Sequence, residues 1–182
     1  MKKTIAPLLF ILAVSSLSLA GEPAEEEFLP IPSRIIKAAE GDWAEFKLGD
    51  ASFRHRVEKI ENGEGGRIVH FAIETLDGGG KVAKKEMKAI TQAQERDASR
   101  RYSDAFDKRG AIAYGDTVLI SDKPVAAIIY IDPGTGSEFW FSDAVGVLNL
   151  VRIDPGEGDK TPRRITVDFG TAADAPPAEE AK

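Results

Sequence analysis

Short segments in which apolar and polar residues alternate follow one another along most of the chain. In the segment from Asp42 to Leu48, the alternation places Ala44, Phe46 and Leu48 on one face, which is the pattern of a half-buried strand. Glycine, proline and aspartate residues separate successive segments, as tight turns between strands require. The pattern therefore predicts a sheet of short strands that follow one another in an antiparallel arrangement.

The two segments on either side of the loop Asn62–Gly66 indicate how they pair. When residues whose numbers add to 128 are placed opposite each other, Arg54 faces Glu74 and Glu58 faces His70, while apolar residues face one another. A shift by one residue would place arginines opposite apolar residues, which a sheet with one buried face disfavours. We therefore predict a hairpin in this register.

A helical pattern covers about Gln92–Arg109. Thr91 and Gln94 match a capping box, in which two side chains satisfy backbone donors at the helix start. Gly110 is suited to the position just after the helix. One narrow face contains the residues expected to pack on the sheet, which are Ala98, Tyr102, Ala105 and Phe106. We predict one main helix here and a second, short helix over residues 34–40.

Together these elements predict an α+β fold. We expect a curved antiparallel sheet of about seven to eight strands, half-barrel-like, with one main helix packed on it. The single domain is expected to span residues 28–170. The acidic segment 21–27 and the tail 171–182, which is rich in Ala, Pro and Glu, contain little that could be buried and are predicted to be disordered.

Residues 1–20 have the features of a secretory signal peptide. Lys2 and Lys3 precede an apolar run from Ile5 to about Val14, and small residues follow it. The run is too short to span a bilayer core of about 30 Å, so we expect a periplasmic or secreted protein without a transmembrane segment. The sequence contains no cysteine, so neither a disulfide nor a lipid anchor is expected.

Charge and motifs narrow the classes of function. The formal net charge is −6, which disfavours a nucleic-acid partner. The motif I-D-P-G-x-G occurs at Ile131 and again at Ile153, but its first copy runs into the strand-like segment Phe139–Phe141 rather than into a helix that would bind phosphate. We interpret the two copies as turns, with a weak cation site as the alternative, and expect no metal and no cofactor.

Catalysis would require a nucleophile with a base within hydrogen-bond reach. Ser142 and Asp143 lie beside an aromatic segment, but no motif supplies a base near them. In the predicted hairpin, His55 and His70 fall on opposite faces and do not converge on one site. A hydrolase or another enzyme that uses Ser142, Asp143 and a histidine is the alternative function, and a protein without enzymatic activity is the favoured one.

Aromatic residues provide the candidate ligand-binding positions. Trp43, Phe139, Trp140 and Phe141 could line an apolar groove, although aromatic residues on strands are also typical of a core. If the protein binds an apolar ligand, we expect a cavity beside these side chains. Solid packing there would instead favour a module that binds a partner protein or has a structural role.

Three segments resemble a loose set of uncharacterised exported bacterial proteins. They are G-D-W-A-E-F at Gly41–Phe46, W-F-S-D-A-V-G-V-L-N-L-V-R at Trp140–Arg152 and V-D-F-G at Val167–Gly170. More remotely, one helix against a curved antiparallel sheet behind a signal peptide is similar to half-barrel carriers of the lipoprotein-localisation-factor type. This resemblance implies an apolar concave face for lipid. The expected function is an exported binding or structural module for a partner protein or an apolar ligand.

Overall fold

The computed structural model describes residues 31–145 and 149–175. The segments predicted to be a signal peptide, 1–20, and a disordered acidic stretch, 21–27, lie outside the described residues. The elements are β1 Trp43–Leu48, β2 Ala51–Gly63, β3 Gly66–Leu76, β4 Val82–Thr91, α1 Gln92–Lys108, β5 Ile112–Ile120, β6 Lys123–Ile131, β7 Glu138–Phe141, β8 Leu150–Asp154, β9 Arg164–Gly170 and the short 3-10 helix η1 Ala172–Asp174.

The nine strands of the described residues form one antiparallel sheet in the order β4-β3-β2-β1-β9-β8-β7-β6-β5. With one α-helix beside it, the fold belongs to the predicted α+β class, but the strand count is nine rather than seven to eight. The strand that the sequence pattern did not reveal is β4. It lies at an edge of the sheet, and most of its side chains face water, so no alternation marks it.

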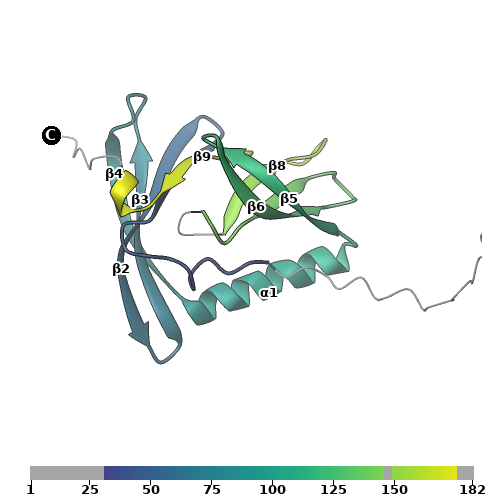
Figure 1. Cartoon of the computed structure of the whole chain (residues 1–182). Coiled ribbons are helices and arrows are strands. Elements are labelled where there is room, and N and C mark those ends of the chain that lie inside the picture. The colour runs from purple at the N-terminus through teal and green to yellow at the C-terminus, as the bar shows by residue number, and fades with distance from the viewer. Residues whose placement is uncertain (1–30, 146–148, 176–182) are drawn as a thin grey trace, which may run out of the picture.

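Two meanders make up the sheet, and α1 joins them. In chain order, the strands β1 to β4 extend from the middle of the sheet to one edge. The strands β5 to β9 then extend from the other edge to the middle, where β9 pairs with β1. Because α1 follows β4 and precedes β5, it has to cross from one edge of the sheet to the other (Figure 1). The helix therefore covers one face of the sheet between its two edge strands.

The half of the sheet from β9 to β5 curls strongly. The turn between β5 and β6 folds back to β9, although three strands separate β5 from β9 in the sheet. The Ser121 hydroxyl donates to the Val167 carbonyl at 2.7 Å, and the Lys123 ammonium donates to the Phe169 carbonyl at 2.7 Å. The sheet is therefore curved, as expected. It does not close into a barrel, because its edge strands β4 and β5 lie at opposite ends of the strand order.

The register predicted for the β2–β3 hairpin holds from Ser52 to Val57, and Arg54 faces Glu74. A β-bulge at Glu58 then shifts the pairing by one residue, so that Lys59 rather than Glu58 faces His70. Glu58 instead forms an ion pair with Lys85 of β4 at 2.8 Å. The bulge thus places Glu58 beside a third strand, a contact that the sequence of the hairpin alone does not reveal.

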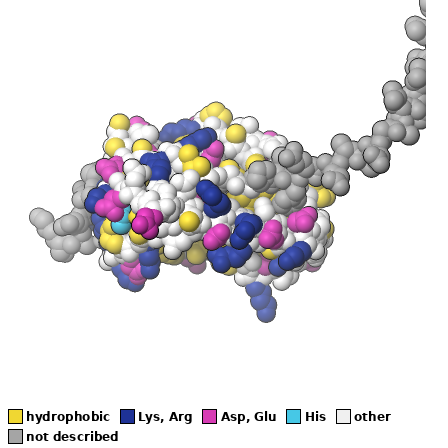
Figure 2. Space-filling view, turned by 90° about the horizontal axis from the view of Figure 1, so that it is seen from below, with side chains coloured by type: hydrophobic (Ala, Val, Ile, Leu, Met, Phe, Trp, Pro, Cys, Tyr) yellow, Lys and Arg dark blue, Asp and Glu magenta, His cyan; other side chains and the backbone are white. Residues whose placement is uncertain are grey.

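The capping box of α1 forms as predicted, with Thr91 and Gln94 each accepting a backbone hydrogen bond from the other residue. Gly110 follows the helix with φ +67°, a conformation that glycine adopts without strain. Phe106 is buried as predicted, but the rest of the buried face differs, because Glu95 is buried whereas Tyr102 is 58% exposed. Figure 2 views the molecule from below relative to Figure 1, which is the side of α1, and shows basic and acidic side chains interspersed there.

Residues 34–40 form a turn rather than the predicted short helix. The Ser33 hydroxyl does not cap them and donates instead to the Glu95 carboxylate of α1. The same carboxylate accepts the backbone N–H groups of Arg34 at 2.9 Å and of Ile35 at 3.2 Å. A tertiary partner thus takes the donors that a local cap would have satisfied, because a carboxylate accepts several N–H groups more strongly than one hydroxyl can.

Buried apolar residues form three separate clusters. The first joins β2 and β3 to the turn at Ile35, the second lies around Val125 and Val151, and the third joins Phe106 of α1 to Tyr130 and neighbouring residues. In the tail that was predicted to be loose, Ala172–Asp174 form η1. Within the described residues, no helix combines the length and apolar content needed to cross a membrane.

Candidate functional site

A cavity of about 420 Å³, hereafter the α1–sheet cavity, lies between the helix and the sheet. The helix contributes Glu95, Ala98, Ser99 and Tyr102, which follow one another at the spacing of a single helical face. The remaining lining residues come from the sheet and its loops, and they are Ile90, Phe139, Phe141, Asn149, Leu150, Ile153, Thr161 and Arg164. Most of the wall is apolar, with a few polar groups.

Strand geometry explains why Phe139 and Phe141 share this cavity. Side chains two residues apart on a strand point to the same face, and Phe139 pairs across the sheet with Ile153, while Phe141 pairs with Leu150. The Phe106 ring of α1 lies 5.1 Å from the Phe139 ring and 6.3 Å from the Phe141 ring, measured between centroids. These contacts connect the cavity wall to the third apolar cluster.

The two tryptophans predicted as ligand-binding residues lie elsewhere. Trp140 points to the opposite face of β7, where its indole Nε1 donates to Glu138 at 3.1 Å and the Arg152 guanidinium lies 5.2 Å from its ring. Trp43 is 3% exposed on β1, opposite Gly170 of β9. The structure therefore brings Phe139 and Phe141 to the α1–sheet cavity, and it places Trp43 and Trp140 in packed positions outside it.

The polar residues of the cavity differ in how well they are paired. The Glu95 carboxylate is held by the three donors of residues 33–35. The Arg164 guanidinium lies 4.0 Å from the centroid of the Phe46 ring, and its Nε is buried without a hydrogen-bond partner in the described part of the chain. Burial lowers the pKa of Arg164 to about 10, so its side chain is charged at neutral pH.

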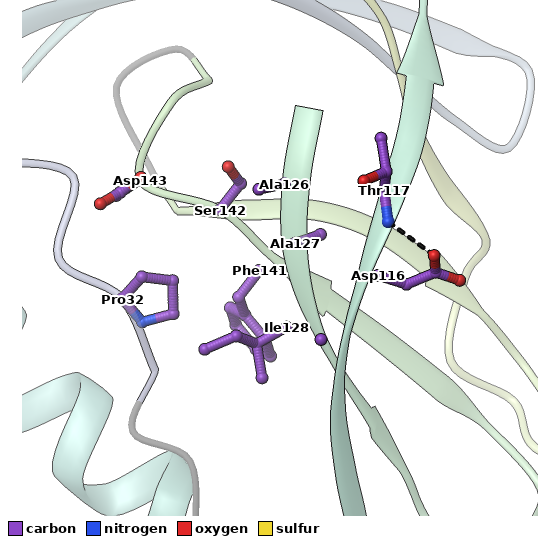
Figure 3. Close-up of a pocket in the computed structure, with 10 residues that line it drawn as sticks. Pro32, Asp116, Thr117, Ala126, Ala127, Ile128, Phe141, Ser142 and Asp143 are labelled. Atoms are coloured by element: carbon purple, nitrogen blue, oxygen red, sulfur yellow. Dashed lines mark hydrogen bonds between the residues drawn. The ribbon is translucent and has the colours of Figure 1, made fainter. Parts of the chain in front are cut away.

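A second, more open pocket of about 500 Å³ contains Ser142 and Asp143, two of the residues in the alternative enzyme hypothesis. Pro32, Asp116, Thr117, Ser142 and Asp143 are among its lining residues (Figure 3). Ser142 is 1% exposed, and its hydroxyl accepts the Ala144 N–H at 3.1 Å. Asp143 forms an ion pair with Lys37 at 2.5 Å.

Neither histidine lines the pocket that contains Ser142. His55 is buried on β2 against the rings of Phe46 and Phe71. His70 contacts Glu61 at 3.1 Å on the other face of the hairpin, as the alternation of positions predicted. A mechanism with Ser142 as nucleophile and a histidine as base thus has no support in the arrangement of these side chains.

The two I-D-P-G loops lie side by side. The first is a hairpin turn between β6 and β7, as predicted, and the second connects β8 to β9. Ser137 joins them, because its buried hydroxyl donates to Asp159 at 2.5 Å and accepts the Gly156 N–H at 2.9 Å. The hydrogen bond from Ser137 is the main reason that the pKa of Asp159 is lowered.

The acidic residues of these loops are bound to separate partners. Asp132 accepts the Gly134 N–H at 2.9 Å and an Arg109 hydrogen bond at 2.9 Å, which together hold its pKa below the ordinary value. Asp154 binds Arg163 at 2.9 Å. In the described ranges, no group of three or more His, Asp or Glu side chains is placed to hold a metal ion.

The chain was compared with protein-family models, curated proteins and solved structures. No protein-family model matches the chain, and no curated protein matches it. A crystal structure of a "putative lipoprotein" from Parabacteroides distasonis superposes with a TM-score of 0.43 and 10% sequence identity, over 72% of this chain and 96% of that chain. The argument for a function therefore depends on the geometry of the site itself.

Proposed function

We propose that the protein is an exported envelope protein without enzymatic activity that binds an apolar ligand in the α1–sheet cavity. The observation that carries this proposal is the cavity of about 420 Å³ between α1 and the strands β7 and β8. Small-molecule sites usually have volumes of roughly 300–1,000 Å³ and mostly apolar walls with a few polar groups. The α1–sheet cavity fits this description in size and in composition.

The packing around the cavity supports a binding role. Protein interiors are close-packed, and voids larger than a water molecule are few. Here the buried apolar residues form three clusters, and the cavity contacts the third of them through Phe141 and Leu150. An empty cavity with such a wall lowers the stability of the folded protein, because the lining side chains lack contacts on one side. A ligand with an apolar body would supply those contacts.

Export is supported by the amino-terminal sequence. Lys2 and Lys3 before the apolar run from Ile5 to about Val14 are typical of a signal peptide, which directs a chain to the envelope or beyond. An apolar ligand in the envelope would include the acyl chains of lipids. The proposal does not include a catalytic step, because the Ser142 hydroxyl has a backbone partner and neither histidine lines its pocket.

The proposal is tested by a substitution on α1 that places a larger side chain in the cavity. Ala98 is half-buried and lines the cavity, whereas Ala105 lies exposed on the same helix and outside it. We expect Ala98→Phe to weaken binding of the uncharged fluorescent probe N-phenyl-1-naphthylamine at least about tenfold, because the new ring occupies the space of the ligand. Ala105→Phe is the matched control and should bind the probe like the unchanged protein.

The measurement is a fluorescence titration of purified protein from which bound lipid has been extracted. Circular dichroism of both variants checks that each keeps its strands and its helix. Equal binding by Ala98→Phe and by Ala105→Phe would contradict the proposal, because the probe would then occupy another surface. Absence of probe binding by the unchanged protein would contradict it as well.

A further inference from the structure

Arg164 is a cationic residue of the cavity wall, and no carboxylate of the described residues forms an ion pair with it. It begins β9, and its guanidinium lies over the ring of Phe46. Its Nε is buried and has no hydrogen-bond acceptor in the described ranges, and burial lowers the pKa of the side chain. A buried charge is unfavourable unless a counter-charge and hydrogen-bond acceptors compensate for its lost hydration.

Other arginines of the described residues have the partners that Arg164 lacks. Arg54 is buried and contacts Glu45 at 3.1 Å and Glu74 at 3.6 Å. Arg109 contacts Asp132 at 2.9 Å. The Nε of Arg54 is also buried without an acceptor, so Arg164 differs from Arg54 in having no ion pair with a carboxylate of the described residues. A carboxylate from outside the protein would supply that ion pair.

The cavity has one carboxylate of its own, and it is already engaged. Glu95 lies on α1 and its oxygens accept from the Ser33 hydroxyl and from two backbone N–H groups. The amide of Asn149 donates to the Pro32 carbonyl at 2.8 Å. Arg164 is thus the cationic residue among the described lining residues, and it stands in a wall that is otherwise largely apolar.

We propose that the α1–sheet cavity binds a single-chain amphiphile with a carboxylate headgroup, a long-chain fatty acid, and that Arg164 binds the carboxylate. This inference rests on the proposed function, since the apolar wall would hold the acyl chain. Guanidinium and carboxylate form paired, charge-assisted hydrogen bonds, and these are strongest where water is excluded. A cavity of about 420 Å³ is near the lower end of ligand-site volumes, which favours one acyl chain over two.

The decisive experiment compares a fatty acid with its own methyl ester. Both compete with N-phenyl-1-naphthylamine for the lipid-free protein, and both have the same apolar chain, but only the acid is charged. We expect tetradecanoate to bind at least about tenfold more tightly than methyl tetradecanoate, because only the carboxylate pairs with Arg164. In Arg164→Gln this preference should disappear, and in Arg164→Lys it should persist in part, because lysine keeps the charge without the planar fork.

Arg152→Gln is the matched control. Arg152 lies on β8 beside Trp140, on the face opposite Phe139, and pairs with Asp154 outside the cavity. This variant should keep the preference of the unchanged protein for the acid. The comparison of acid and ester in the unchanged protein requires no variant, so it tests the proposal even if Arg164→Gln fails to fold.

The outcomes separate this inference from the proposed function. Equal binding of the acid and the ester by the unchanged protein would overturn the role of Arg164 and leave an apolar site in place. A preference for the acid that persists in Arg164→Gln would overturn it too. If neither compound displaces the probe, and Ala98→Phe binds the probe normally, the proposed function fails together with the inference.

Discussion

His55 shows how burial sets the chemistry of a single residue. Its side chain is 4% exposed, and its ring contacts the rings of Phe46 at 4.6 Å and of Phe71 at 5.7 Å between centroids. Burial, and to a lesser degree the nearby charge of Arg164, lowers its pKa from 6.5 to about 3. The imidazole is therefore neutral in the folded protein at neutral and mildly acidic pH.

This lowered pKa predicts a pH dependence of stability. In the unfolded chain His55 binds a proton near pH 6.5, whereas the folded protein binds it only near pH 3. The unfolded state thus binds more protons in this range, so the free energy of unfolding is highest above pH 6.5 and falls as the pH is lowered. The loss from this residue can reach about 1.4 kcal/mol per pH unit.

Urea unfolding of the unchanged protein and of His55→Leu at pH values between 6.5 and 4.5 measures the effect. We expect the free energy of unfolding to fall more steeply with acidification in the unchanged protein than in the variant. The carboxylates with lowered pKa, such as Asp132 and Asp159, titrate mainly below this window. Parallel slopes for the two proteins would show that His55 is not buried in its neutral form.

At the scale of elements, the two I-D-P-G loops are distinct turns that support each other. A Cβ atom built on Gly156 would lie 1.7 Å from the Thr135 carbonyl oxygen of the other loop, which is far inside van der Waals contact. Glycine at this position is therefore required by the approach of another segment, which the loop sequence alone does not reveal. The repeated motif thus marks a pair of packed turns between neighbouring strands.

Replacing Gly156 with alanine should separate these loops. We expect Gly156→Ala to lower the free energy of unfolding by about 1–3 kcal/mol, because the backbone has to move to admit the new methyl group. Gly78→Ala is the control, since a Cβ there meets nothing within 4 Å. Both values come from urea unfolding. A loss in Gly156→Ala no larger than in the control would contradict the loop contact.

At the scale of the whole molecule, the strongly curled sheet and the crossing helix together enclose the cavity. α1 spans the sheet between its two edge strands, and the half from β5 to β9 curls so that the β5–β6 turn reaches β9. Among the described residues, two residue pairs, Arg152–Ile165 and Ile153–Arg164, join β8 to β9. The lining residues come from both sides of this junction, so the shape of the cavity depends on how β9 joins β8 within the second meander.

A ligand in this cavity should stabilise the entire fold. A compound that binds only the folded state at one hundred times its Kd raises the free energy of unfolding by about 2.7 kcal/mol. For a domain of this size we expect a rise in Tm of roughly 5–10 °C with saturating tetradecanoate. Thermal unfolding measures it, and Ala98→Phe should show a much smaller rise. An equal rise in both proteins would indicate binding outside the cavity.

Local patterns predicted a large share of the fold. The capping box of α1 and the end of this helix at Gly110 depend on residues that are close in the sequence. The pairing of Arg54 with Glu74 depends on one neighbouring strand. The turn at residues 34–40 and the bulge at Glu58 could not be predicted, because Glu95 and Lys85 act on them from distant elements. Of the predicted ligand residues, Phe139 and Phe141 line the cavity. Trp140 lies between them on the same strand, and the alternation of side chains along a strand places it on the other face.

The sequence by itself determined most of the strands, the position of α1 and the amino-terminal features typical of an exported chain, because each follows from periodicity and residue type over a short stretch. It did not reveal β4, which lacks alternation. Only the tertiary structure decided that Glu95 is buried on α1, where the sheet curls, and that Arg164 lies over Phe46 in an apolar wall without a carboxylate partner among the described residues. The physical reason is that burial and pairing depend on neighbours such as residues 46, 95 and 164, which are distant along the chain.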